Sequence, residues 1–201
     1  MLGIVDYKMG NLASVQNAFL KVGAKAKIVR EVEELLLCSH LVLPGVGAFK
    51  EAVLHLKERG LKEALEEYVK SGKPLLGICL GMQLLFERSF EFGESEGLCF
   101  LKGDVLPFDK ALDRGFKIPH VGWNEVLKIK ESPLLAGVEE RFYLYFVHSF
   151  YVENQENALA ISEYGVSFSS IVQKDNVFGI QPHPEKSHDV GLKILENFVR
   201  I

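Results

Sequence analysis

Cys79 stands in the pattern Gly77-Ile-Cys79-Leu-Gly81, between an apolar run and a helical pattern. A glycine two residues away on each side permits a sharp strand-to-helix turn. Side chains at these two positions would clash there, because the start of the helix and the neighbouring strand come too close for Cβ atoms. Such a nucleophile elbow exposes the reactive side chain, and the helix that follows favours a thiolate and a nearby oxyanion. The pattern indicates a nucleophilic thiol. The alternative is a small buried hydrophobic residue at a strand end.

A histidine and a carboxylate near the C-terminus have the residue types that activate a thiol. His183 and Glu185 follow Gln181 in Gln-Pro-His-Pro-Glu, where the prolines disfavour a helix and predict an extended segment with both side chains on one side. A carboxylate beside an imidazole fixes its tautomer and stabilises the imidazolium. By itself the segment is more typical of a proline-rich turn with a surface ion pair. Together with Cys79, at the end of another predicted strand, it favours catalysis.

Three further segments are less specific. Gly45-Val46-Gly47 follows a predicted strand, and its N–H groups can turn toward a developing negative charge, although an ordinary strand–helix turn is the more common meaning. No Gly-Lys-Ser/Thr follows, which argues against a phosphate loop. His148, within a strand-forming run, is interpreted as a structural histidine. Trp123 is either a core aromatic residue or part of a partner surface.

The elements that position these residues follow from the apolar patterns. The first half predicts strands at Leu2–Asp6, Ala26–Val29, Leu41–Leu43 and Leu75–Ile78, and helices at Asn11–Val22, Phe49–Lys70 (broken at Gly60) and Leu80–Arg88. Such alternation produces a parallel sheet flanked by helices. The second half predicts appended antiparallel or mixed strands at Leu98–Phe108, Trp123–Lys130, Phe142–Glu153, Ala158–Tyr164 and Phe168–Lys174, then a strand at Val177–Gln181 and a helix at Val190–Val199. The expected fold class is α/β, as a single domain over residues 1–201.

Composition excludes several functions. The 201 residues include 23 Lys+Arg and 27 Asp+Glu, a formal charge of −4, and no basic run that would suit nucleic acid. No stretch approaches the roughly 20 apolar residues of a membrane span, and the N-terminal segment does not resemble a signal peptide. The cysteines Cys38, Cys79 and Cys99 are far apart, which favours free thiols in the cytoplasm. No metal-ligand spacing is present, and neither a metal nor another cofactor is expected.

Together these motifs resemble class I (triad-type) glutamine amidotransferases, which have a flavodoxin-like sheet. Gly-Ile-Cys-Leu-Gly-Met-Gln with a distant His-Pro-Glu carries that resemblance. Asp6-Tyr-Lys-Met-Gly-Asn-Leu12, Pro44-Gly-Val-Gly47 and Pro119-His-Val-Gly-Trp-Asn124 narrow it to the glutaminase subunits of imidazole glycerol phosphate synthases, which serve histidine biosynthesis. The resemblance covers essentially the whole chain. Lys8 departs from it, because the family usually has glycine there, and this leaves the first strand–helix loop in question.

The resemblance implies a role for each matching position. Cys79 would attack glutamine, His183 would transfer the proton, and Glu185 would orient His183. The oxyanion would be held by the backbone N–H of Leu80 and by a peptide of the Gly45–Gly47 loop, that is, at Val46 or Gly47. The substrate would contact Gln83, Glu91 and the backbone of Ser149 and Phe150. The assignment of Glu91 depends on matching Ser89-Phe90-Glu91 to a Ser-Glu-Glu pattern of the family.

The resemblance also implies a partner, a (β/α)8-barrel cyclase that receives the ammonia. The residues that would face this cyclase are Asn11, Trp123, Tyr145 and Lys186. The cyclase would join ammonia to its nucleotide substrate, releasing imidazole glycerol phosphate and aminoimidazole carboxamide ribotide. Three alternatives stay open: a glutaminase of another pathway, a thiol hydrolase or peptidase that acts alone, and a binding module without catalysis.

Overall fold

The computed structural model of the chain describes residues 1–111, 115–153 and 156–201. Within this part, nine strands form one mixed sheet in the order β2-β1-β3-β4-β13-β12-β11-β8-β9. The parallel strands are β1 (Leu2–Val5), β2 (Ala26–Val29), β3 (His40–Gly45), β4 (Leu75–Cys79) and β13 (Val177–Ile180). The antiparallel extension is β8 (His120–Lys128), β9 (Arg141–His148), β11 (Ala158–Glu163) and β12 (Ser167–Lys174). The α/β class with appended antiparallel strands is therefore confirmed.

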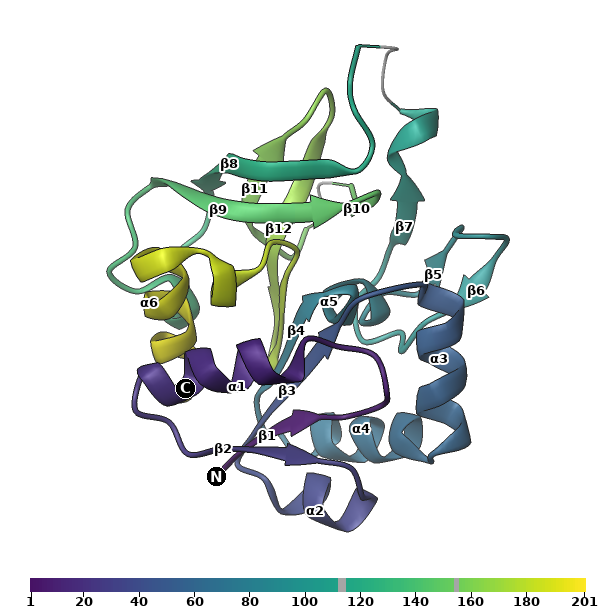
Figure 1. Ribbon diagram of the computed structural model, residues 1–201, viewed down its shortest axis with the longest axis vertical. Coiled ribbons are helices and arrows are strands. Elements are labelled where there is room, and N and C mark those ends of the chain that lie inside the picture. The colour runs from purple at the N-terminus through teal and green to yellow at the C-terminus, as the bar shows by residue number, and fades with distance from the viewer. Residues whose placement is uncertain (112–114, 154–155) are drawn as a thin grey trace.

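Helices cover both faces of the parallel region (Figure 1). On one face, α1 (Leu12–Lys21) and α6 (His188–Val199) share a hydrophobic cluster through Phe19 and Phe198. On the other face, another cluster unites α2 (Val32–Leu37), α3 (Phe49–Glu58) and α4 (Leu61–Lys70). Every residue of β1, β4 and β13 is buried, because apolar helices cover both sides of these strands.

The antiparallel extension has a different burial pattern. Along β9, Phe142, Leu144 and Phe146 point into the core, while the residues between them are more exposed. This alternation is typical of a sheet with one packed face. A smaller sheet lies beside the extension, and in the described chain it consists of β10 (Phe150–Val152), β7 (Asp104–Pro107), β5 (Arg88–Ser89) and β6 (Ser95–Glu96).

The segment after Cys79 differs from the sequence prediction. The expected helix Leu80–Arg88 is the short helix α5 (Leu80–Leu84). It ends early because the carbonyl of Leu84 accepts a hydrogen bond from Leu98 N, and that of Leu85 accepts from Phe100 N and Leu101 N. These long-range bonds replace the next helical turn. The same loop explains why Leu98–Phe108 forms a strand only from Asp104 onward.

Three other short elements were not predicted. The helix α2 is too short to give a helical apolar pattern, and the strands β5 and β6 have only two residues each. Three short 3-10 turns complete the described elements: η1 (Phe108–Lys110), η2 (Pro133–Leu135) and η3 (Pro184–Lys186).

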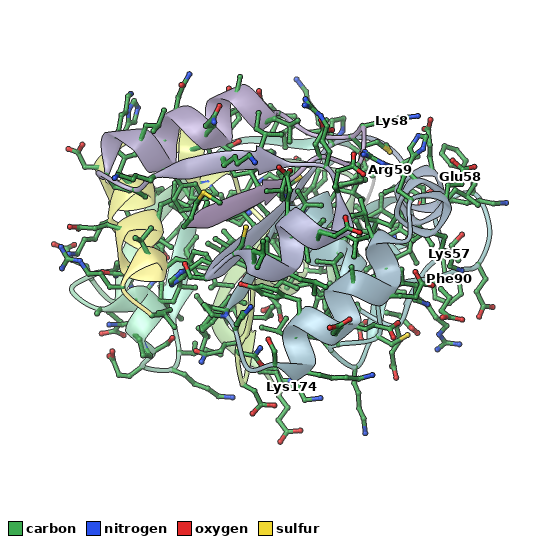
Figure 2. The ribbon with its side chains drawn as sticks, turned by 90° about the horizontal axis from the view of Figure 1, so that it is seen from below. Lys8, Lys57, Glu58, Arg59, Phe90 and Lys174 are labelled. Atoms are coloured by element: carbon green, nitrogen blue, oxygen red, sulfur yellow. The ribbon has the colours of Figure 1, made fainter. Side chains whose placement is uncertain are left out.

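The loop after β1 accounts for the departure at Lys8. This residue has φ of 72°, in the left-handed region that glycine adopts without strain. Its N–H donates to the Asp6 carboxylate at 3.0 Å, and Arg30 and Arg59 also bind Asp6, through its carboxylate and its carbonyl respectively. Lys8 and Arg59 lie close together at the edge of the molecule (Figure 2). The loop therefore keeps a backbone conformation that suits glycine, although lysine occupies the position.

Candidate active site

Cys79 lies at the junction of β4 and α5. Its φ of 55° and ψ of −114° are strained for a residue with a side chain. A Cβ on Gly81 would lie 1.7 Å from Leu43 O, and one on Gly77 would lie 2.5 Å from Gly81 O. The elbow therefore forms only because both flanking positions lack a side chain, as the sequence pattern indicates. The Cys79 side chain is nearly buried, at 7% exposure.

His183 and Glu185 follow β13, next to β4 in the sheet. The Nδ1 atom of His183 lies 2.8 Å from Glu185 Oε1, and both side chains are almost fully buried. The prediction of one extended segment is wrong beyond His183, because Pro184 starts η3, in which Lys186 N donates to His183 O at 3.0 Å. This tight turn, and not strand alternation, brings the carboxylate back to the imidazole.

The environment of His183 favours its protonated form. Burial opposes the charge, but the electrostatic interactions of the imidazole with nearby Cys79 and Glu185 raise its pKa above the ordinary value. Within the described residues the buried Nε2 atom of His183 has no geometrically well-formed hydrogen bond. In the described part of the chain, the polar contacts of Cys79 Sγ are long, 3.9 Å to Val147 O and 3.9 Å to Gln181 Nε2. A thiol, a free imidazole nitrogen and a carboxylate are thus arranged for nucleophilic catalysis.

The thiol and the imidazole line one cavity of about 220 Å³. This is smaller than the roughly 300–1,000 Å³ of sites for drug-sized ligands, so it suits a small metabolite. The structure brings every sequence-predicted oxyanion and substrate position to this cavity, together with Pro119, Val147 and His148: the predicted positions are Val46, Gly47, Leu80, Gln83, Glu91, Ser149 and Phe150.

Two of the predicted substrate contacts already have partners. The Nε2 atom of Gln83 donates to Gln181 Oε1 at 2.9 Å and to Phe150 O at 3.2 Å. One carboxylate oxygen of Glu91 accepts a hydrogen bond of 2.6 Å from the N–H of Phe49, at the start of α3. These contacts hold the cavity wall together from four separate segments of the chain.

Sequence reasoning missed two residues of this site. Gln181 is fully buried and contacts both Gln83 and Cys79, although the sequence pattern marked it only as a residue preceding proline. His148 is buried and lines the cavity, although its place in an apolar strand indicated only a structural histidine. A polar residue inside a strongly apolar run was the available signal in both cases.

The predicted partner-facing residues lie close to η3. The ring of Trp123 is 46% exposed and stacks on His188 at 5.0 Å, with Tyr145 edge-on at 6.1 Å. The Lys186 ammonium lies 5.9 Å from the centre of the Tyr145 ring. Asn11 precedes α1, the helix whose Ser14 and Asn17 line a groove with Lys186. An exposed aromatic surface therefore adjoins the turn that carries Glu185.

The sequence and the fold match those of a known class of enzyme. The family model "Glutamine amidotransferase class-I" matches residues 3–201. Among solved structures, PurLQS from Thermotoga maritima superposes with a TM-score of 0.77 at 20% identity, covering 99% of this chain and 97% of that chain. A crystal structure described as a glutamine amidotransferase superposes with a TM-score of 0.76 at 21% identity, covering 98% of both chains. At these identities the likeness concerns the fold.

Relatives with higher identity narrow the family. The "Imidazole glycerol phosphate synthase subunit HisH" of Wolinella succinogenes is 59% identical over the full length of both chains. The protein of the same name from Sulfurimonas denitrificans is 54% identical, covering 100% of this chain and 98% of that protein. This chain therefore belongs to the HisH family of class-I glutamine amidotransferases.

Two features are absent from the described residues. No helix in residues 1–111, 115–153 and 156–201 is long and apolar enough to cross a membrane. The same residues contain no group of three or more His, Cys, Asp or Glu side chains arranged to hold a metal ion.

Proposed function

We propose that this chain is the glutaminase subunit of an imidazole glycerol phosphate synthase and that it hydrolyses L-glutamine to glutamate and ammonia. One observation carries the proposal: Cys79 and His183 share a small cavity, with Glu185 bound to the far side of the imidazole. The full-length identity to HisH subunits supports the choice of pathway.

The proposed reaction starts from the Cys79 thiolate and the His183 imidazolium. Sulfur attacks the side-chain amide carbon of glutamine and forms a tetrahedral oxyanion. The N–H of Leu80 and a peptide N–H at Val46 or Gly47 stabilise this charge. The imidazolium then gives its proton to the departing nitrogen, which leaves as ammonia, and a thioester remains. Water deprotonated by the now neutral His183 attacks the thioester, and collapse of the intermediate expels the Cys79 thiolate and releases glutamate, which restores the thiolate–imidazolium pair.

Glutamine is held by the other groups of the cavity in this proposal. Gln83 and Glu91 bind its polar groups, and the backbone of Ser149 and Phe150 meets its α-carboxylate. The cavity volume supports a substrate of this size. The free thiols Cys38, Cys79 and Cys99 support the cytoplasm as the compartment.

The proposed partner is a (β/α)8-barrel cyclase that docks on Asn11, Trp123, Tyr145 and Lys186 and receives the ammonia. The relatives from Wolinella succinogenes and Sulfurimonas denitrificans are named as synthase subunits, which supports a complex. The exposed Trp123 ring supports this surface, because tryptophan is enriched at interface hot spots.

Cys79→Ala tests the proposal in the complex with the cyclase. We expect the variant to lose synthesis of imidazole glycerol phosphate from glutamine and to retain synthesis from added ammonia. Loss of both activities contradicts separate glutaminase and synthase sites. Unchanged activity from glutamine supports a binding module without catalysis. Glutaminase stimulation by another synthase overturns the pathway, and strong ester or peptide hydrolysis without any partner favours a free-standing hydrolase.

A further inference from the structure

Two buried histidines, one in the cavity wall and one behind it, have no part in the proposed reaction. His120 on β8 pairs with His148 at the end of β9, and His120 Nδ1 lies 2.9 Å from His148 Nε2. The two residues are 3% and 6% exposed. His148 lines the cavity, whereas His120 continues away from it toward Asn124. The pair thus connects the wall of the site to the outer half of β8.

Neighbouring groups determine which nitrogens carry hydrogen. The Oδ1 atom of Asn124 accepts from Glu125 N at 2.8 Å, and its Nδ2 donates to Glu163 O at 2.9 Å, which fixes the orientation of the amide. The same Nδ2 lies 3.4 Å from His120 Nε2, which must therefore be the acceptor. At the other end, His148 Nδ1 lies 2.7 Å from Phe150 O. A carbonyl only accepts, so His148 Nδ1 carries the hydrogen.

A single hydrogen-bond direction follows from these ends. Asn124 donates to His120 Nε2, His120 Nδ1–H donates to His148 Nε2, and His148 Nδ1–H donates to Phe150 O. Both rings must be neutral. A proton added to His120 would sit on Nε2 and face the N–H of Asn124, and a proton added to His148 would sit on Nε2 and face the N–H of His120. Burial supplies this condition: it lowers the pKa of His120 to about 4 and that of His148 to about 3.

Phe150 O, where the chain of hydrogen bonds ends, is also bound from the nucleophile helix. It accepts a second hydrogen bond from Gln83 Nε2 at 3.2 Å. The ladder to β7 does not use this carbonyl: Phe150 is opposite Pro107, and Phe108 N donates to Ser149 O, which makes Phe150–Pro107 a non-hydrogen-bonded pair. The orientation of the Phe150 carbonyl therefore depends on side chains, and His148 makes the shorter of the two contacts.

We propose that His120 and His148, as neutral Nδ1–H tautomers, are positioning residues that hold the Phe150 carbonyl and so present the backbone strip 149–150 to the α-carboxylate of glutamine. This inference rests on the proposed function. A carbonyl turned toward that carboxylate would repel it, whereas a carbonyl held by His148 and Gln83 leaves the N–H groups of the strip for the anion.

Two alkylating probes separate this role from that of the triad. A diazoketone analogue of glutamine carries the α-carboxylate and alkylates a thiolate with loss of nitrogen, whereas iodoacetamide lacks the carboxylate. For His148→Phe, which fills the ring volume but cannot donate, we expect the apparent affinity for the diazoketone to fall on the order of tenfold. The rate of Cys79 alkylation by iodoacetamide should stay within about twofold, since the tenfold effect concerns only carboxylate binding.

The matched control is His148→Asn, which keeps an N–H donor close to the Nδ1 position and should recover most of the diazoketone affinity. His120→Phe and His120→Asn form a second pair and keep the test decisive if His148→Phe does not fold. A long-range ¹H–¹⁵N spectrum of the wild-type chain should show hydrogen on Nδ1 and not on Nε2 of both rings.

Specific outcomes overturn the inference. These are an equal loss of reactivity with both probes, an unchanged diazoketone affinity in both phenylalanine variants, an asparagine variant as weak as the phenylalanine variant, or an Nε2–H tautomer at His148. A wild-type chain that reacts with iodoacetamide but not with the diazoketone contradicts the proposed function itself, and the two failures are thereby distinguished.

Discussion

At the scale of single residues, the site combines full burial with charge. The Glu185 carboxylate and the His183 imidazole are 1% and 3% exposed, so each charge depends on the other for stabilisation. Only one carboxylate oxygen has a hydrogen-bond partner among the described residues. In such surroundings the removal of one charge lowers the stability of the folded chain more than it does at the surface, where ion pairs contribute little to stability.

Glu185→Gln should lower the glutaminase kcat on the order of 100-fold or more, by analogy with carboxylate removal from other triads. The amide retains the shape of the side chain but loses the charge that helps to raise the pKa of His183. The measurement is glutamate release in the presence of the cyclase. Glu58→Gln, at an exposed position, is the control and should have wild-type activity. A kcat within threefold of wild type for Glu185→Gln would contradict the assigned orientation role.

The buried histidine pair should make the folded chain sensitive to acid. His120 and His148 have folded-state pKa values of about 4 and about 3, whereas their ordinary value is 6.5. Below pH 6.5 the unfolded chain therefore binds protons that the folded chain does not, and the free energy of unfolding falls as the pH decreases. Each histidine contributes up to about 1.4 kcal/mol per pH unit. The raised folded-state pKa of His183 acts in the opposite sense near pH 7, where only the folded chain is fully protonated at this residue, and it contributes no slope well below pH 6.5, where both states are protonated.

Urea unfolding of the wild type and of His148→Phe between pH 7 and pH 5 measures this effect. The variant lacks one of the groups that titrate on unfolding, so its stability should depend on pH less steeply, by about one proton. Identical slopes for the two proteins would show that His148 is not held neutral in the folded chain.

At the scale of elements, the elbow depends on how closely β3, β4 and α5 approach one another. Gly81 sits against the carbonyl of Leu43 on the neighbouring strand, and Gly77 sits against the backbone of Gly81. The short helix α5 packs against β3 and β4, which are paired with each other, and all of its residues are buried. The position of Cys79 is therefore determined by backbone contacts, which have no flexible side chain that could yield.

Gly81→Ala should unfold the chain or destabilise it by more than about 3 kcal/mol, in the range of severe core disruption. The added Cβ would lie 1.7 Å from Leu43 O, and only movement of a strand can relieve that overlap. Thermal unfolding and soluble yield are the measurements. Gly115→Ala is the matched control, because its added Cβ would meet no atom of the described residues within 4 Å. A Gly81→Ala protein with wild-type stability would show that β3 and α5 can separate.

At the scale of the whole molecule, the cavity and the aromatic surface adjoin the same turn. In η3, Glu185 contacts His183 while the neighbouring Lys186 lies over Tyr145 on the surface. His183 N also donates to Tyr145 O at 2.8 Å, so the triad and the proposed interface share a backbone contact. A partner bound at this surface would therefore contact the segment that positions the His183 imidazole.

Trp123→Ala should weaken binding of the cyclase on the order of 10-fold to 30-fold, the effect of losing a typical hot-spot side chain. The ring is 46% exposed and stacks on His188, so its removal should leave the core intact. Calorimetric titration of the cyclase gives the affinity. Leu37→Ala removes an even more exposed apolar side chain, on α2, and should bind normally. Equal affinities for Trp123→Ala and wild type would move the proposed interface elsewhere.

Local sequence patterns were sufficient to predict much of the fold and of the candidate site. The α/β class, the positions of the main strands along the chain and the elbow at Cys79 follow from apolar periodicity and from glycines whose spacing has a direct steric meaning. Lys8 illustrates the limit: its departure from the family pattern was visible, but only its φ of 72° revealed that the loop retains a glycine-like conformation.

The sequence by itself determined which residues have the chemistry of a thiol, a base and an orienting carboxylate, because those properties belong to residue types and short spacings. Only the tertiary structure decided that η3 returns Glu185 to His183, that α5 stops at Leu84, and that His148 binds Phe150 O beside the cavity. Each of these depends on hydrogen bonds that form after the chain has folded, and those that end α5 join separate segments. A local sequence pattern does not specify where a buried donor or acceptor finds its partner.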